Sequence, residues 1–166
     1  MKNVGKLQVS TPSEREIAMT RVFDAPRGMV FDAWTKPELL TRWLGVRGGW
    51  TFAICQVDLR VGGFYRFVWR GPGGLEMGMG GIYREIARPD RLVATEKFDE
   101  SWYEGEALDT TTFVEHDGKT TATATVRYAS QQVRDAVLKS PMERGVAESY
   151  DKLDEVLASA PVRSGK

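Results

Sequence analysis

The spacing of apolar positions divides the chain into a strand, two short helices, a run of strands and one long helix. Residues 17–23 have the composition and alternation of a strand. Pro26 then fits the first turn of a helix, whose apolar face consists of Val30, Phe31 and Trp34. Residues 35–38, Thr-Lys-Pro-Glu, have the spacing of a capping box. We therefore expect a second short helix that Thr35 caps, with an apolar stripe of Leu39, Leu40 and Trp43.

Between Trp50 and Tyr128 the helical spacing gives way to short β-branched and aromatic runs separated by turn residues. The turns are Gly62-Gly63, Gly71 to Gly74, Arg88 to Asp90 and Asp117-Gly118. Such runs between turns predict six strands, arranged as an antiparallel meander.

The last element is a long amphipathic helix. Ser140, Pro141 and Glu143 combine a capping box with a proline at the first helical position. The apolar stripe that follows is Met142, Val146, Tyr150, Leu153 and Leu157. We expect Asp154 on the polar flank. Because the stripe and the apolar face of the sheet must cover each other, the sequence predicts an α+β domain. Its curved antiparallel sheet, of about seven strands, wraps around the C-terminal helix.

The two ends of the chain are polar and rich in small residues. We expect residues 1–13 and 161–166 to be flexible tails, with a single domain at 14–160. A length of 166 residues fits one domain with a core large enough to contain a cavity.

The composition argues against several classes of function. Lys plus Arg and Asp plus Glu number 23 each, so net charge favours neither nucleic acid nor a membrane surface as partner. Cys55 and His116 are the only residues of their kinds, so no zinc site is expected, and His116 beside a hairpin tip is expected to be solvated. Neither a phosphate loop nor a nucleophile elbow occurs, so we expect no cofactor. No secretory signal or membrane span is evident, which favours a cytoplasmic protein.

Three segments carry motifs that occur together in one known family. They are Phe23-Asp24-Ala25-Pro26 leading to Leu40-Thr41-Arg42-Trp43, Asp58 to Gly63 leading to Gly81 to Ile86, and Met142 to Gly145 leading to Ser149 to Leu153. Their order and spacing resemble the activator of heat-shock protein 90 ATPase-like branch of the START-like superfamily, which is related to polyketide cyclases. The resemblance implies a helix-grip fold with a pocket between helix and sheet. Many bacterial members of this branch have no assigned reaction, and fold alone assigns none.

Glu96 is the first candidate for chemistry. It lies in a strand-like run at 91–98, where Leu92, Ala94 and Phe98 share its face. If that face is the inner one, Glu96 is desolvated, its pKa is raised, and it can act as an acid, a base or an anchor for a polar ligand group. The alternative is a structural glutamate that faces solvent or binds an arginine such as Arg66.

Asp109 is the second candidate, and its direction depends on a turn. A two-residue turn at Asp117-Gly118 pairs Asp109 with Val126 and directs Asp109 inward, near Glu96. A three-residue loop with a bulge at Gly118 shifts the register and directs Asp109 outward.

Small residues stand where a filled core would have large ones: Ala122 and Ala124 on a strand, and Gly145 on the long helix. Either helix and sheet approach closely there, or the missing volume is a ligand cavity, which the implied pocket favours. The pocket residues that we expect are Trp34, Trp43, Phe67, Trp69, Met77, Met79, Glu96, Phe98, Asp109, Phe113, Ala124, Tyr128, Gly145 and Tyr150.

Three functions fit these features, and no catalytic residue can be assigned. The first is a module that binds a small apolar molecule, with Glu96 or Tyr128 fixing one polar group. The second is a protein-interaction module, either a homodimer or a co-chaperone-like domain that stimulates a heat-shock ATPase. The third is a polyketide cyclase-like enzyme whose carboxylates move protons. A buried Glu96 beside open volume favours the first or third, and a solvated Glu96 over a filled interior favours the second.

Overall fold

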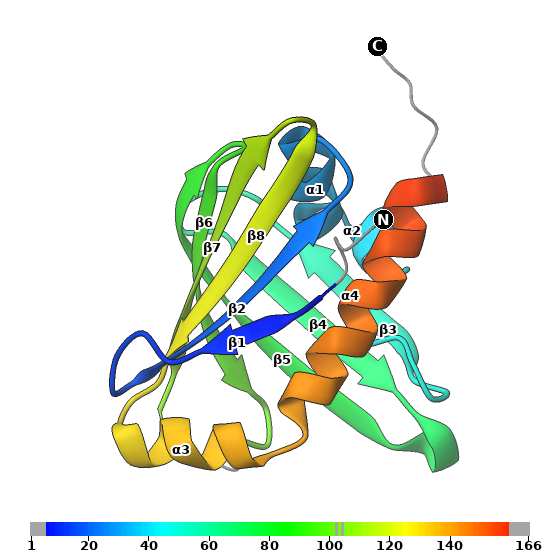
Figure 1. Ribbon diagram of the computed structural model, residues 1–166. Helices are drawn as coiled ribbons and strands as arrows, with labels where there is room; N and C mark the ends of the chain where they lie inside the picture. Colours follow the sequence, from blue (N-terminus) through cyan, green and yellow to red (C-terminus); the bar gives the residue numbers. More distant parts are fainter. Residues whose placement is uncertain (1–5, 102, 104, 160–166) are drawn as a thin grey trace.

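The fold is a curved antiparallel sheet with helices on its concave side (Figure 1). The computed structural model describes residues 6–101, 103 and 105–159. Its eight strands have the spatial order β1-β2-β8-β7-β6-β5-β4-β3. Their bounds are β1 Gln8–Ser10, β2 Glu16–Phe23, β3 Thr51–Val57, β4 Phe64–Arg70, β5 Glu76–Ala87, β6 Arg91–Phe98, β7 Ala107–His116 and β8 Lys119–Arg127. The six strands expected between Trp50 and Tyr128 are β3 to β8, and they form the predicted meander.

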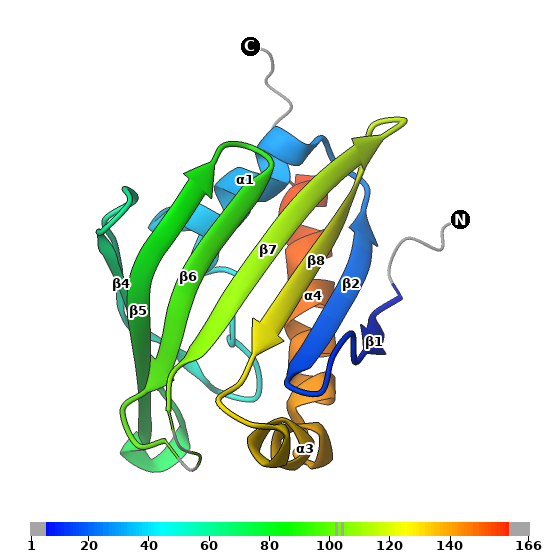
Figure 2. The same ribbon diagram turned by 90° about the vertical axis from the view of Figure 1, so that its left-hand side faces the viewer.

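The helices form the second layer. Their bounds are α1 Arg27–Thr35, α2 Pro37–Leu40, α3 Gln131–Lys139 and α4 Met142–Ser159. Figure 2 shows the outer face of the sheet, with α1 and α4 behind strands β6 to β8. The two-layer α+β helix-grip fold is therefore confirmed. No helix in the described ranges is both long and apolar enough to cross a membrane.

Four local expectations differ from the structure. Residues 8–10, in the expected tail, form β1 and pair with β2. Helix α3 was not expected at all. Thr35 is the last residue of α1, and its hydroxyl donates to the Phe31 carbonyl at 2.9 Å. Ser140 is the C-cap residue of α3, and its hydroxyl donates to the Val137 carbonyl at 2.6 Å. Both capping-box interpretations are wrong, because each hydroxyl satisfies the carbonyls of the preceding helix.

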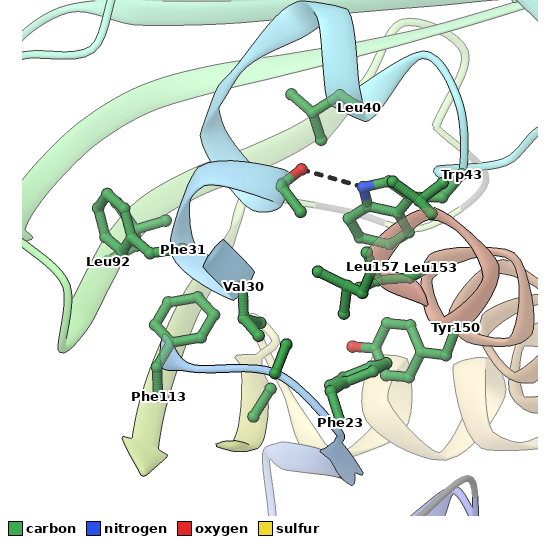
Figure 3. Close-up of a cluster of buried hydrophobic side chains, with 14 of the residues drawn as sticks. Phe23, Val30, Phe31, Leu40, Trp43, Leu92, Phe113, Tyr150, Leu153 and Leu157 are labelled. Carbon is green, nitrogen blue, oxygen red and sulfur yellow. Dashed lines mark hydrogen bonds between the residues drawn. The ribbon is translucent and has the colours of Figure 1, made fainter. Parts of the chain in front are cut away.

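The apolar stripe of α4 is confirmed. Tyr150, Leu153 and Leu157 are buried, and Met142 and Val146 pack partly buried against the same clusters of apolar side chains. Figure 3 shows the three buried residues pointing toward core side chains that include Phe23 and Trp43. Full burial of a side chain such as Leu153 stabilises the fold by about 1.5 to 3 kcal/mol. The stripe therefore fixes α4 over the sheet.

A buried arginine also ties α4 to the sheet. Arg21 of β2 is 3% exposed, and its guanidinium donates to Asp151 at 2.9 Å and to Asp154. Its Nε atom has no hydrogen-bond partner among the described residues. The expectation that Asp154 lies on a polar flank without structural contacts is wrong, because its carboxylate neutralises the buried guanidinium of Arg21.

Candidate functional site

Glu96 and Asp109 meet on the inner face of the sheet, and we call them the acid pair. Glu96 of β6 lies opposite Ala107 of β7, and Asp109 lies opposite Ala94 of β6. The two carboxyl groups are thus diagonal neighbours on adjacent strands, within reach of each other. Alanine at both opposing positions leaves room for them, and the two side chains are hydrogen-bonded.

The register that directs Asp109 inward comes from the hairpin turn. Asp117 and Gly118 have φ values of 55° and 78°, as a two-residue type I′ turn requires. His116 pairs with Lys119, and the ladder continues to the pair of Asp109 with Val126. The two-residue alternative is therefore confirmed, and the bulge at Gly118 is excluded.

The acid pair is desolvated and has no cationic partner in the described part of the chain. Burial, followed by the charge and hydrogen bond of Asp109, raises the pKa of Glu96. Burial raises the pKa of Asp109 too, although hydrogen bonds with Glu96 and Thr111 oppose the rise. Arg66 is not the partner, because its two terminal nitrogens each donate to Asp99 at 2.6 Å. The pair therefore retains a proton at a pH where ordinary carboxyl groups are ionised.

Tyrosines surround the acid pair from four parts of the fold. They are Tyr65 of β4, Tyr103 between β6 and β7, Tyr128 after β8 and Tyr150 of α4. Burial is the main reason that the pKa of each phenol is raised, and the charge of one or both carboxylates adds to it. Tyr65 donates to the Thr95 carbonyl at 2.8 Å. The ring of Tyr103 stands edge-on to that of Tyr128 at 5.7 Å.

Two of these phenols have polar groups that the protein leaves unused. Tyr128 and Tyr150 are only 6% and 5% exposed, and within the described residues neither hydroxyl has a hydrogen-bond partner. The Arg21 Nε atom is nevertheless the only unpaired polar side-chain atom there that is closed off from solvent. Both phenolic oxygens therefore border accessible space. Glu96 and Asp109, although inward-facing, also remain partly exposed. The acid pair and the two hydroxyls are therefore not sealed off from solvent.

Most of the expected aromatic residues belong to packed core. The Trp34 ring lies 4.9 Å from Trp43, 5.4 Å from Phe113 and 5.6 Å from Tyr150. Trp43 donates to the Ala33 carbonyl at 3.0 Å, so its indole is already satisfied. These rings belong to one core cluster.

A second row of side chains lies nearer the acid pair. Phe67 of β4, Met79 of β5 and Phe98 of β6 are opposite one another across three strands. Phe67 is buried, whereas Met79 and Phe98 are partly exposed. Trp69 donates to the Leu44 carbonyl at 2.9 Å, and its neighbour Met77 is 45% exposed. Met79 and Phe98 are thus partly exposed apolar side chains on the inner face.

Two of the small residues have structural explanations. Ala124 is buried in a cluster with Ile17 and Val126. A side chain at Gly145 would meet the Arg47 guanidinium at 3.1 Å, so the approach of this arginine is a structural reason for the glycine. The place of Gly145 in a pocket stays a prediction.

Two site residues were missed by the sequence analysis. Tyr65 alternates with Phe67 and Trp69 along β4, so period-two spacing could have identified it. Tyr103 lies outside any regular element, where no periodicity indicates its direction.

The fold and the acid pair occur in a chain whose sequence matches a known family. The sequence profile of "Activator of Hsp90 ATPase homolog 1-like protein" matches residues 24–158. The chain belongs to this family. The resemblance of its three motif segments is thereby confirmed. No curated protein sequence matches the chain.

Solved structures agree with the family assignment. A crystal structure of a protein from Rhodobacter sphaeroides is 34% identical, with a TM-score of 0.88 over 93% of this chain and 99% of that one. Protein Ms6760 from Mycobacterium smegmatis is 22% identical, with a TM-score of 0.80 over 95% and 100%. CalU16 from Micromonospora echinospora is 20% identical, with a TM-score of 0.62 over 93% and 85%. The last two likenesses establish the family's fold alone.

Two hollows on the molecular surface are lined by residues other than the acid pair. One, of about 570 Å³, is lined by residues 13–16 and Arg127. The other, of about 300 Å³, is lined by residues that include Arg84, Thr95 and Tyr128. Neither is the cavity expected between α4 and the sheet, which stays a prediction. Among the described residues, no group of three or more His, Cys, Asp and Glu side chains could hold a metal.

Proposed function

We propose that this domain binds a small, largely apolar molecule on the inner face of its sheet, with the acid pair holding the molecule's polar group. The observation that carries the proposal is the desolvated pair beside the hydroxyls of Tyr128 and Tyr150, which border accessible space and have no partner among the described residues. Polar groups that the protein leaves without partners on an accessible apolar surface are available to hold the polar group of a ligand.

The neighbouring surface suits the apolar part of such a ligand. Met79 and Phe98 are partly exposed on the inner face, and a flexible methionine adapts to ligands of different shapes. Membership of a helix-grip family supports the proposal, because helix and sheet in this fold diverge. Few precisely placed polar groups in an apolar surface are typical of small-molecule sites.

The proposal can be tested with N-phenyl-1-naphthylamine, an apolar dye that is uncharged at neutral pH and fluoresces when bound. We expect saturable binding to the wild-type protein. Met79→Trp, which fills inner-face space, should weaken binding at least about tenfold, whereas Val114→Trp should not, since Val114 is 61% exposed on the outer face. Equal effects of the two substitutions, with both proteins folded by circular dichroism, would refute an inner-face site.

A protein-interaction function is the second candidate, because one exposed apolar patch also needs explanation. Phe64 and Ile82 lie directly opposite on β4 and β5 and are 44% and 41% exposed. Leu59 and Val61 of the adjoining loop add to the patch. The name of the family includes an ATPase activator, which supports a protein partner. If the patch mediates self-association, Phe64→Ser should abolish any dimer seen by analytical ultracentrifugation and leave dye binding unchanged.

The acid pair also supports the third candidate, an enzyme. A carboxyl group with a raised pKa can exchange a proton with a bound substrate. In that case Glu96→Gln should remove turnover of a bound, enolisable ligand, which deuterium exchange at its acidic C–H would report. An exchange rate equal to that in the wild type would exclude this role.

A further inference from the structure

The charge around the acid pair is unbalanced. Two arginines of the sheet are committed to other carboxylates: Arg21 to Asp151 and Asp154, and Arg66 to Asp99. No salt bridge among the described residues includes either member of the pair. With one shared proton, the pair retains one negative charge in a site that is mostly closed to water.

The polar atoms around the pair are mainly acceptors. The two carboxyl groups present four oxygens, and one shared proton leaves most of their lone pairs free. The unpartnered hydroxyls of Tyr128 and Tyr150 can also accept hydrogen bonds. The other phenols that face the pair are Tyr65, which donates to Thr95, and Tyr103, which packs on Tyr128.

Anionic, neutral and cationic ligand groups would fit these features to different degrees. An anionic group would add like charge to a desolvated carboxylate. A neutral group would leave that charge uncompensated. A protonated amine offers up to three donors to the acceptors, opposes the negative charge, and can lie against a tyrosine ring, which attracts cations.

We propose that the acid pair and the hydroxyls of Tyr128 and Tyr150 recognise a protonated amine, so that the ligand class is a small monoamine with an apolar body. This inference rests on the proposed function and specifies the polar group that the site selects. The ammonium group lies between the carboxyl groups and the phenols, and the apolar body extends along Met79 and Phe98.

Proton release follows from this arrangement. A cation beside the acid pair stabilises both carboxylates, so the proton that they share without ligand leaves to solvent as the amine binds. The facing groups on the other elements do not compete for this role, because the four tyrosines stay neutral and Arg21 is neutralised by two aspartates.

The experiment compares three ligands with similar aromatic bodies: 2-phenylethylamine, 2-phenylethanol and 3-phenylpropanoate. Each displaces bound N-phenyl-1-naphthylamine from the wild-type protein at pH 7. We expect the amine to displace the dye at a concentration at least about tenfold lower than the alcohol, and the carboxylate to be weakest. Calorimetry in two buffers of different ionisation enthalpy should show release of about one proton per amine bound.

Variants connect the preference to the acid pair. Glu96→Gln and Asp109→Asn should each retain dye binding while reducing the preference for amine over alcohol to about onefold. Glu155→Gln, on the exposed face of α4, is the control and should keep the wild-type preference. Two acid variants are used so that one remains informative if the other does not fold.

The outcomes separate this inference from the proposed function. If the dye binds but the amine displaces it no better than the alcohol, or not at all, the amine inference fails and ligand binding on the inner face stands. If the amine preference persists in both acid variants, recognition does not involve the pair and the inference also fails. If the dye does not bind the wild-type protein, the proposed function fails and this inference with it.

Discussion

Replacement of Glu96 by Gln should change how the free energy of unfolding depends on pH. An unfolded glutamate has a pKa of about 4.3, whereas burial and Asp109 raise the pKa of folded Glu96 to about 8. Between these values the folded protein holds a proton that the unfolded chain releases. Stability is therefore fully present below the unfolded pKa and is lost as pH rises through the folded pKa. Glutamine keeps the shape of the side chain and removes this titration.

The size of the effect follows from the width of the window. One pKa unit corresponds to about 1.4 kcal/mol, so a full proton difference over the two pH units from 5.5 to 7.5 would amount to about 3 kcal/mol. Glu96 is partly exposed on the inner face, and water there weakens the penalty on its charge. We therefore expect Glu96→Gln to be more stable than wild type at pH 7.5, by about 1 to 3 kcal/mol relative to their difference at pH 5.5.

Urea unfolding followed by tryptophan fluorescence, at half-unit steps from pH 5 to 8, measures this difference. The comparison of two proteins is needed because another group titrates in the same range. Burial raises the pKa of Asp109 to about 6, so this carboxyl group also makes stability fall as pH rises through that value. Glu155→Gln is the matched control, since it removes an exposed carboxylate from α4 and should follow the wild-type curve.

Parallel curves for wild type and Glu96→Gln over this range would refute the reasoning. They would mean that Glu96 is ionised in the folded protein at pH 5.5, either because water solvates it fully or because a cation outside the described residues compensates it. A steeper curve for Glu96→Gln would be a stronger contradiction, because it reverses the sign.

Two further predictions concern the attachment of α4. Asp154→Ala should destabilise the protein by about 1 to 3 kcal/mol, because it removes one partner of a buried arginine. Asp151→Ala should destabilise it by less than about 1 kcal/mol, since that carboxylate is 66% exposed. Equal losses of unfolding free energy in urea would contradict this ranking. Leu153→Ala should cost about 2 to 5 kcal/mol at a fully buried position, whereas Lys152→Ala on the exposed flank should change stability by less than about 0.5 kcal/mol. If α4 does not pack through this stripe, Leu153→Ala and Lys152→Ala would have the same melting temperature by calorimetry.

The features that could be predicted from the sequence are those in which buried residues recur at the regular spacing of a helix or a strand. The stripe of α4 recurs at helical spacing, and the inner face of β6 recurs at every second residue, so both identify a face without knowledge of the partner. Asp109 could be predicted only conditionally, because its direction depends on the length of a turn. The positive φ values of Asp117 and Gly118 show that the turn has two residues, and this turn directs Asp109 inward.

The features that could not be predicted depend on contacts between distant segments. Arg21 is separated from Asp151 by 130 positions, and an arginine in an alternating strand is usually exposed. Capping boxes failed for a related reason: a hydroxyl between two helices can cap the second or satisfy the first, and the local sequence is the same in both cases. Helix α3 did leave one signal, since Ser130 accepts from the Val133 amide as a regular N-cap.

The acid pair is kept inside by the same register that buries the core. A slip of one residue between β7 and β8 would turn Asp109 to solvent, but it would also turn out Phe113, which is 2% exposed and packs against Phe31 and Trp34. Exposure of a fully buried phenylalanine costs about 1.5 to 3 kcal/mol, and the two-residue turn would have to change as well. Strand β7 therefore cannot relieve its buried carboxyl group by shifting. The remaining ways to neutralise the charge are to retain a proton or to bind a cation, which is why a site held in place by core packing suits the recognition of a protonated amine that we propose.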